Sequence, residues 1–252
     1  MSREKTTERV ERLLIEAILG GTFPPGSALP GERALSKELG VARPALREAL
    51  QRLHRDGWLD IQQGRSTRVN DFMQEGDLAL LARLLKTQSS LLPTFVPRLL
   101  EVWEVLAPVY TRQAVLNAPE KVVEQVEGYR GMAARPEFFA RAQWRLHRAL
   151  AEWSGNVVYA LVLNGFADFY VRFATQDYAE PAQGAGLCAF WGALADAARC
   201  KDAGEAAALV AGDLAAQRAR WSGERLTAWL EVIQAQEAGR EAEEKNESDA
   251  NT

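Results

Sequence analysis

The segment from Phe23 to Val69 constrains the fold of this chain most, because it predicts a helix with one buried face and one cationic face. The helix spans Arg43–Arg55 and has Pro44 in its first turn, where a missing amide hydrogen costs nothing. At 100° of rotation per residue, one arc of it is apolar and forms a buried stripe. The members of this stripe are Leu46, Ala49, Leu50 and Leu53. The neighbouring arc points outward and carries Arg43, Arg47, Gln51 and Arg55.

The outward arc indicates an anionic partner. Arg43 and Arg47 are one helical turn apart, and like charges at that spacing repel by a few tenths of a kcal/mol. Phosphates and guanine edges would remove this repulsion, because a guanidinium group can bind either of them through two hydrogen bonds. The pattern therefore predicts a nucleic-acid-binding helix.

Two more predicted helices precede this one, and a hairpin follows it. The first helix covers Thr7–Leu19, and the second covers Glu32–Leu39 with Gly31 before it as a weak cap. After Asp56 and Gly57, two short β-rich runs flank a glycine-containing turn that carries Arg65, as in a hairpin. Three helices and a small β-hairpin wing predict a winged helix-turn-helix domain over residues 1–72.

The rest of the chain predicts an all-α bundle of six to seven helices, so the fold class is mainly α. Residues 73–77 form a predicted linker, residues 78–235 a helical effector-binding and dimerisation domain, and residues 236–252 a disordered acidic tail. The predicted helices are Leu78–Leu85, Phe95–Leu116, Glu120–Ala134, Glu137–Ser154, Val157–Tyr178, Gly186–Cys200 and Ala203–Ile233.

Composition is consistent with these predictions and excludes several classes of protein. Residues 1–72 hold 12 basic and 10 acidic residues, net +2, whereas the remainder has a net charge of −6. The DNA prediction therefore depends on arginine placement and not on bulk charge. The two cysteines, Cys188 and Cys200, lack a CxxC spacing and indicate a reducing cytoplasm. We expect no signal peptide, because the start Met1-Ser-Arg-Glu-Lys leads into a charged amphipathic helix, and no membrane span, since no run of eighteen apolar residues occurs.

Three motifs resemble the N-terminal domain of the GntR family of bacterial transcription regulators. They are Leu29-Pro-Gly-Glu-Arg-Ala-Leu35, Val41-Ala-Arg-Pro-Ala-Leu-Arg-Glu-Ala-Leu50 and Arg55-Asp-Gly-Trp-Leu59. A further stretch, Ser154-Gly-Asn-Val-Val-Tyr-Ala-Leu-Val-Leu-Asn-Gly165, resembles the effector domain of the fatty-acid-responsive FadR subfamily. Together these segments imply similarity over nearly the whole chain up to about Trp229.

The resemblance implies which residues contact DNA. An isolated surface arginine is usually only a solvated charge, but several arginines here match positions where family members contact DNA. The implied contact residues are Arg33, Arg43, Ala45, Arg47, Gln63, Gly64 and Arg65. The chain departs from the subfamily in having Ala42, Pro44 and Ala45 instead of threonines, and Gln63-Gly64-Arg65 instead of His-Gly-Lys in the wing. These losses of hydroxyl groups imply a different operator in detail.

The resemblance also bears on ligands of the helical domain. Many family members hold a metal through an aspartate and three histidines, whereas the matching positions here are His147, Gln143, Trp191 and Asp213. We therefore expect no metal and no cofactor, because a tryptophan has no lone pair for a metal. The expected effector-binding residues are Trp103, Tyr178 and Trp221. Positions that hold acyl-CoA in the subfamily correspond to Asp213 and Gln217.

Taken together, the resemblance implies a homodimeric, cytoplasmic transcription regulator that binds double-stranded DNA at a palindromic operator. Its implied small-molecule effector is a long-chain fatty acyl-CoA, and its implied targets are fatty-acid metabolism genes. The alternatives are a regulator that responds to another metabolite such as an organic acid, a DNA-binding dimer without an effector, and a helical enzyme. The last is disfavoured, because the chain has no P-loop, no GxGxxG after a strand and no nucleophile elbow.

Overall fold

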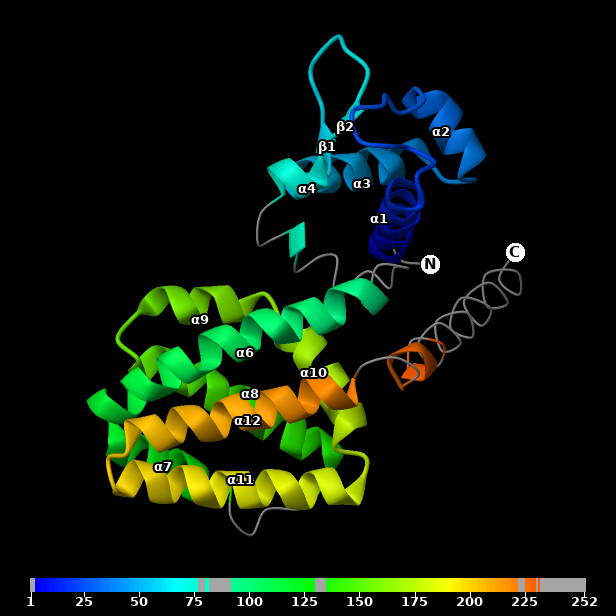
Figure 1. Cartoon of the computed structure of the whole chain (residues 1–252). Coiled ribbons are helices and arrows are strands. Elements are labelled where there is room, and N and C mark those ends of the chain that lie inside the picture. The colour runs from blue at the N-terminus through cyan, green and yellow to red at the C-terminus, as the bar shows by residue number, and fades with distance from the viewer. Residues whose placement is uncertain are drawn as a thin grey trace. The chain divides into compact units, whose positions relative to one another are not determined.

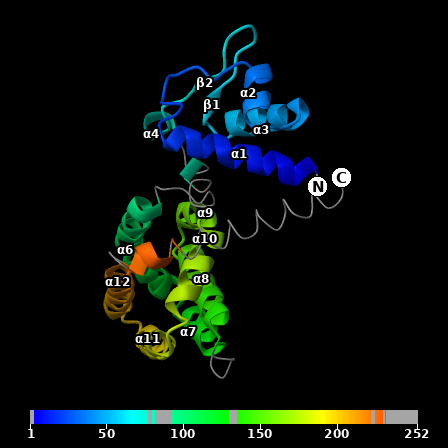
Figure 2. The ribbon, with the colours of Figure 1, turned by 90° about the vertical axis from the view of Figure 1, so that its right-hand side faces the viewer.

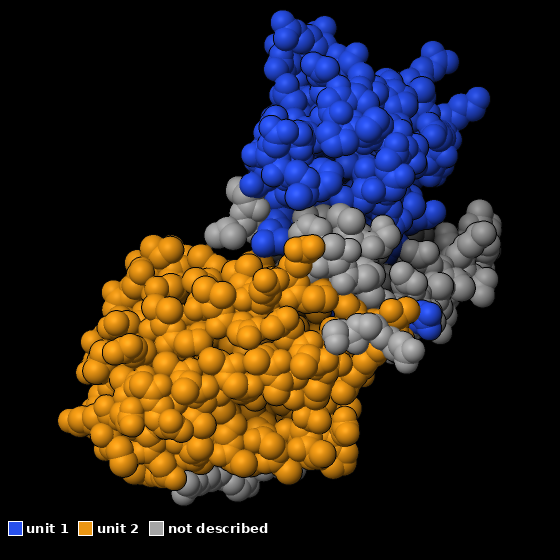
Figure 3. Space-filling model, in the orientation of Figure 1, with its two compact units in different colours: residues 1–92, 229–252 blue, residues 93–228 orange. Residues whose placement is uncertain are grey.

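The computed structural model describes residues 3–76, 80–81, 92–129, 135–221, 225–229 and 231. The chain divides into two compact units, shown in Figure 3. The first comprises residues 1–92 and 229–252, and the second comprises residues 93–228. Most of the predicted helix Leu78–Leu85 and the whole predicted tail 236–252 lie outside the described residues.

The first unit contains the predicted winged helix-turn-helix. Its elements are α1 (Arg3–Leu19), α2 (Glu32–Glu38), α3 (Arg43–Arg55), β1 (Leu59–Asp60), β2 (Arg68–Val69) and α4 (Phe72–Glu75). The helix α3 has the bounds that the sequence predicted, and it packs against both α1 and α2. Strands β1 and β2 are antiparallel, with Leu59 opposite Val69, and the loop between them projects from the domain as the wing (Figure 1).

The winged domain is held together by buried apolar side chains, most of them from its helices. Leu14 and Ile18 of α1, Leu46 and Leu53 of α3, and Trp58 before β1 are all buried. Burial of such side chains contributes about 1.5–3 kcal/mol each. The small β-sheet therefore depends on the helices beneath it, because two strands alone are only marginally stable.

The predicted linker at residues 73–77 begins inside a helix, which corrects that boundary. Asp71 caps α4, since its Oδ1 accepts a hydrogen bond from the Met73 amide at 3.2 Å. A helix of four residues has no apolar periodicity, so the sequence pattern did not reveal it. The aromatic ring of Phe72 lies against Trp58, with the ring centroids 5.5 Å apart, and this contact joins α4 to the winged domain.

The second unit is an all-α bundle, as predicted. Its described helices are α6 (Leu92–Asn117), α7 (Pro119–Glu127), α8 (Pro136–Trp153), α9 (Val157–Asn164), α10 (Ala167–Asp177), α11 (Pro181–Arg199) and α12 (Ala203–Arg220). Helix α8 packs against α9 and α10, and α11 packs against α7 and α12 (Figures 1 and 2). Pro119, Pro136 and Pro181 occupy helix starts, where proline is favoured.

Several predicted helix bounds were wrong, and the predicted helix Gly186–Cys200, for example, begins earlier, at Pro181. The predicted helix Val157–Tyr178 is two helices, α9 and α10, which meet at a bend of 77°. The sequence pattern continued through the bend because both helices bury apolar side chains. The predicted helices Glu120–Ala134 and Ala203–Ile233 end early, at Glu127 before Gly128 and at Arg220 before Trp221.

No single helix among the described residues is long and apolar enough to cross a membrane. Residues Val157–Asn164 and Phe169–Asp177 meet that test only when the two bent segments are taken together.

Candidate DNA-binding surface and effector site

The two arcs predicted for α3 are confirmed by their exposure. Leu46, Ala49, Leu50 and Leu53 are buried, whereas Arg43, Arg47, Gln51 and Arg55 are exposed. The arginines are therefore available to a partner, and the helix is anchored by its opposite face. Arg52 lies outside both arcs and forms ion pairs with Glu11 and Glu48, with N–O distances of 3.3 and 2.7 Å. Arg52 thus joins α3 to α1 and has a structural role.

Arg47 is joined to α2 by an ion pair. Its Nε donates a hydrogen bond to Glu32 Oε2 at 2.6 Å, and the two side chains are 68% and 41% exposed. A pair this exposed contributes little to stability. The pair orients the guanidinium group of Arg47. Arg33, on α2, is also exposed.

The wing presents the predicted residues Gln63, Gly64 and Arg65 to solvent. Gly64 has a φ of +76°, a left-handed conformation that favours glycine and forms the turn. Arg65 Nη1 donates to Gln62 Oε1 at 2.9 Å, so a side chain on the same turn orients this arginine. The wing tip is therefore compact and cationic.

One predicted contact residue does not belong to this surface. Ala45 is only 5% exposed, because it lies on the side of α3 that faces the domain core. The resemblance to family motifs implied a contact at Ala45, but a motif does not show toward which side of the helix a side chain points. Arg68, in contrast, was not predicted, yet it is exposed on β2 and donates from Nη2 to the Gly26 carbonyl at 2.9 Å. The sequence places Arg68 in the second β-rich run of the predicted hairpin, but nothing in the pattern marked it as a contact residue.

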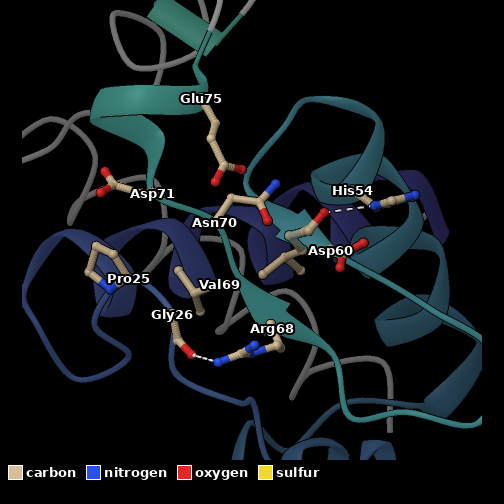
Figure 4. A pocket seen from close by; sticks show the side chains of 10 residues that line it. Pro25, Gly26, His54, Asp60, Arg68, Val69, Asn70, Asp71 and Glu75 are labelled. Atoms are coloured by element: carbon tan, nitrogen blue, oxygen red, sulfur yellow. Dashed lines mark hydrogen bonds between the residues drawn. The ribbon is translucent and has the colours of Figure 1, made fainter.

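A pocket of about 520 Å³ lies between the end of α3, the wing strands and α4 (Figure 4). Its lining includes His54 and four residues with ionic side chains, Asp60, Arg68, Asp71 and Glu75. His54 Nδ1 is hydrogen-bonded to the Leu59 carbonyl at 2.7 Å. With three carboxylates beside one arginine, the pocket is unsuited to a phosphate group.

The second unit encloses a network of hydrogen bonds between buried side chains. Trp103 Nε1 donates to the hydroxyl oxygen of Tyr110 at 2.8 Å, and that oxygen lies 2.8 Å from His147 Nδ1. Burial lowers the pKa of His147 to about 3 and raises the pKa of Tyr110 well above 10. At neutral pH both side chains are therefore uncharged, as the dry interior requires.

Gln143 connects this network to two further helices. Its Oε1 accepts from Trp191 Nε1 at 2.8 Å, and its Nε2 donates to Asp213 Oδ2 at 3.2 Å. Burial, with the nearby charge of Asp177, raises the pKa of Asp213 to about 6, although Arg220 and Gln143 partly oppose the shift. The network thereby joins α6, α8, α11 and α12 through side chains in the middle of the bundle.

These residues include the four that match the metal-ligand positions of other family members, and they do not fit a metal. Both ring nitrogens of His147 face protein groups, Tyr110 on one side and Gln143 at 3.4 Å on the other. Trp191 can only donate, and Gln143 already uses its oxygen to accept from that indole. No cluster of three or more metal-ligating side chains occurs within the described part of the chain.

The three predicted effector residues, Trp103, Tyr178 and Trp221, are all buried. Tyr170 of α10 lies beside Trp103, with their ring centroids 4.7 Å apart, and Tyr178 caps the C-terminus of the same helix. Trp221 packs on Phe173 at 4.4 Å, so α10 contacts all three predicted residues. The sequence analysis missed Tyr170, because an aromatic residue in a helical pattern is usually only part of the core.

A buried carboxylate also lies at this end of the bundle. Asp177 is completely buried and accepts hydrogen bonds from Arg220 and from Trp221 Nε1, at 2.7 and 2.9 Å. Arg225 Nη2 lies 3.5 Å from it. Asp177 therefore fixes the end of α10 against the end of α12.

The winged domain with its arginine surface, followed by a helical domain with a polar interior, is the architecture of a bacterial transcription regulator. The family model described as "Bacterial regulatory proteins, gntR family" matches residues 6–69. The model described as "FadR C-terminal domain" matches residues 70–228. The chain belongs to the gntR family and carries the FadR type of C-terminal domain; it is a regulator and not an enzyme.

Proteins similar to this chain include curated relatives and solved structures. The "Fatty acid metabolism regulator protein" of Erwinia tasmaniensis is 39% identical over 171 residues, which cover 68% of this chain and 72% of the relative. The protein of the same name from Shewanella sp. (strain MR-4) is 40% identical over 171 residues, covering 68% and 71%. The solved structure of Lar, which controls the expression of the Listeria monocytogenes agr system, has a TM-score of 0.50 and is 16% identical to this chain. The match covers 84% of this chain and 94% of the Lar chain, and it supports the fold.

Proposed function

We propose that this chain is a cytoplasmic, DNA-binding regulator of fatty-acid metabolism genes, whose affinity for its operator is controlled by a long-chain fatty acyl-CoA. The observation that carries the proposal is the pairing of an exposed arginine surface with a FadR-type effector domain in one chain. The similarity to curated relatives named as fatty acid metabolism regulators supports the choice of fatty-acid metabolism.

On the DNA side, α3 and the wing act together. Arg43 and Arg47 present two guanidinium groups one helical turn apart, and each can bind a guanine edge or a phosphate through paired hydrogen bonds. Arg65 at the wing tip adds a contact to the phosphate backbone of the DNA. Such a contact fixes the register of the domain on the duplex but does not distinguish one base from another. One such helix reads only a few base pairs, so a specific operator requires two copies of the domain.

A homodimer supplies the two copies, and an exposed apolar face on the second unit is suited to form it. Val105 of α6 and Leu161 of α9 are 67% and 60% exposed, and apolar neighbours on both helices are exposed with them. The other members are Val102, Val109, Leu116, Val157 and Val158. We call these seven side chains the apolar face. A twofold dimer over this face would bury it and would match the symmetry of a palindrome.

On the effector side, the interior of the second unit is rich in aromatic rings. Trp103, Trp144 and Tyr170 lie against one another, with ring centroids 4.7–5.6 Å apart. An acyl chain among such rings is stabilised by about 0.8 kcal/mol for each buried methylene group. Because the bundle is packed at native density, entry of the chain displaces helices and so changes the spacing of the two winged domains. Regulation requires that the ligand prefer the non-binding state by several kcal/mol.

The deciding experiment titrates acyl-CoAs of increasing chain length against the purified protein, with and without operator DNA. We expect tryptophan fluorescence to change and operator affinity to fall as the acyl chain lengthens. Short organic acids serve as the comparison, since they test the alternative effector class. If acyl-CoAs of every length leave fluorescence and operator affinity unchanged, the effector belongs to another class and only the DNA-binding part of the proposal stands.

A further inference from the structure

The pair formed by Tyr110 and His147 carries one hydrogen-bond donor more than its neighbours can accept. The Tyr110 oxygen receives a hydrogen bond from Trp103 Nε1 and lies 2.8 Å from His147 Nδ1. On the other side of the ring, His147 Nε2 faces the amide nitrogen of Gln143 at 3.4 Å. A neutral imidazole carries one N–H and one bare nitrogen, so the ring can donate on only one side.

Neither placement of the ring hydrogen satisfies all the groups. If Tyr110 donates to Nδ1, the ring hydrogen is on Nε2 and points at the Gln143 amide group, which is itself a donor. If Nδ1 donates to Tyr110, Nε2 accepts from Gln143, and the hydroxyl hydrogen of Tyr110 has no acceptor among the described residues. In either case one buried N–H or O–H is unmatched, which costs free energy.

Rotation of the Gln143 amide does not remove the mismatch. In the present orientation Oε1 accepts from Trp191 and Nε2 donates to Asp213, at 2.8 and 3.2 Å. Exchange of the two atoms would give His147 Nε2 an acceptor. It would also turn a donor toward the Trp191 indole and an oxygen toward the Asp213 carboxylate. One hydrogen bond would be gained and two would be lost, so the excess donor remains at the Tyr110–His147 pair.

We propose that this unmatched donor binds the uncharged carbonyl oxygen of the effector's thioester, an inference that rests on the proposed function. Tyr110 and His147 are both about 1% exposed, so a carbonyl reaches them only from within the bundle. The aromatic rings of Trp103 and Tyr159 lie beside the pair, with centroids 5.1 Å from His147 and 5.7 Å from Tyr110. These rings offer an apolar wall to the first methylene groups next to the carbonyl.

The surroundings of the pair favour a neutral acceptor over a carboxylate. Asp213 is one hydrogen bond away from Gln143, whose amide faces His147. A second carboxylate at this place would be repelled by Asp213, and the repulsion is strong in an interior of low dielectric constant. The site therefore distinguishes an acyl thioester from the free fatty acid of the same length.

A charge-preserving exchange of two side chains tests this inference. In the double variant Gln143→Glu with Asp213→Asn, the carboxylate at position 143 accepts from both Trp191 and His147 Nε2, and the amide at position 213 donates back to it. The missing acceptor is thus supplied by the protein. We expect a higher thermal midpoint for the ligand-free protein and about a five-fold weaker affinity for acyl-CoA.

Infrared spectroscopy with a carbon-13 label at the thioester carbonyl reports the hydrogen bond directly. In the wild-type complex we expect the carbonyl band at a lower frequency than that of the same thioester in a solvent without hydrogen-bond donors. In the double variant we expect this shift to be lost. The single variant Asp213→Asn should narrow the affinity gap between acyl-CoA and the free fatty acid. Tyr129→Phe is the control, because the Tyr129 hydroxyl is hydrogen-bonded to Gln125 outside the network and its loss should leave the band unchanged.

The outcomes separate this inference from the proposed function. If acyl-CoA binds the wild-type protein without a carbonyl shift, or if the double variant keeps the shift, the effector proposal stands and the carbonyl contact is wrong. If acyl-CoA does not bind at all, both fail. A double variant with an unchanged or lower thermal midpoint would contradict the donor excess itself, whatever the ligand does.

Discussion

Arg47 of α3 and Glu32 of α2 are joined by an ion pair of 2.6 Å on the surface that we propose binds DNA. The carboxylate of Glu32 therefore competes with any phosphate or guanine for the guanidinium group of Arg47. This competition can be measured, because the two side chains are exposed and their substitution leaves the core of the domain intact.

The first prediction concerns this pair. Arg47→Ala should lower operator affinity by about 1–3 kcal/mol, the cost of one guanine contact. Glu32→Gln should raise DNA affinity, because it removes the competing carboxylate. Fluorescence anisotropy with labelled operator at physiological salt measures both, and Lys121→Ala, an exposed cation of the second unit, is the control. Unchanged affinity for Arg47→Ala would exclude this face of α3 from the DNA interface.

The second prediction concerns the apolar face of α6 and α9. Val105→Asp should convert the proposed dimer to a monomer, because a charge buried in the proposed apolar interface cannot be solvated. Sedimentation analysis measures the association, and operator affinity should fall with it. Ala189→Asp, at an exposed position of α11, introduces the same charge elsewhere and should leave the dimer intact. If both variants remain dimeric, the interface lies on another surface.

The third prediction is a pH dependence with two opposing contributions. The pKa of His147 falls from 6.5 to about 3 on folding, so its contribution to stability is complete above pH 6.5 and is lost as pH falls through about 3. The pKa of Asp213 rises from 3.8 to about 6, so its contribution is complete below pH 3.8 and is lost as pH rises through about 6.

Between about pH 4 and pH 6 the two groups change the free energy of unfolding in opposite directions, each by about 1.4 kcal/mol per pH unit. Their pH dependences therefore cancel in this range. Asp213→Asn should therefore make unfolding free energy fall more steeply with acidification, and His147→Gln should make it fall less or rise. Urea unfolding at several pH values measures these slopes. Identical slopes in the wild-type protein and both variants would show that the two groups titrate normally.

The fourth prediction concerns the buried carboxylate of Asp177. Asp177→Asn should lower the unfolding free energy by about 3–5 kcal/mol, because it leaves the arginines paired with it without a full counter-charge. Glu180→Gln removes an exposed carboxylate 3.6 Å from Arg225 and should cost less than about 1 kcal/mol. Chemical unfolding followed by tryptophan fluorescence compares the two. Equal effects would mean that burial of Asp177 has no energetic consequence.

The fifth prediction concerns metal content. We expect the purified protein to contain no stoichiometric transition metal, because the ring nitrogens of His147 face Tyr110 and Gln143. Elemental analysis is the measurement. About one zinc or nickel ion per subunit, lost in His147→Ala, would show that the network opens to bind a metal.

The sequence by itself determined the winged domain and the helical class of the remainder. The stripe of Leu46, Ala49, Leu50 and Leu53 and the exposed arc of Arg43 and Arg47 follow from helical periodicity, a local property that neighbouring residues impose. The hairpin could be predicted for the same reason, because a glycine such as Gly64 marks a turn that other residues adopt only with strain.

Only the tertiary structure decided where helices bend and which polar groups meet. The break between α9 and α10 interrupts a continuous apolar pattern, so periodicity could not reveal it. Tyr110 and His147 are 37 positions apart, and Gln143 and Asp213 are 70 apart. Contacts between residues so distant in sequence arise from packing of whole helices, and no local pattern encodes them. The donor excess at Tyr110 and His147 therefore becomes visible only when the folded bundle brings these side chains together.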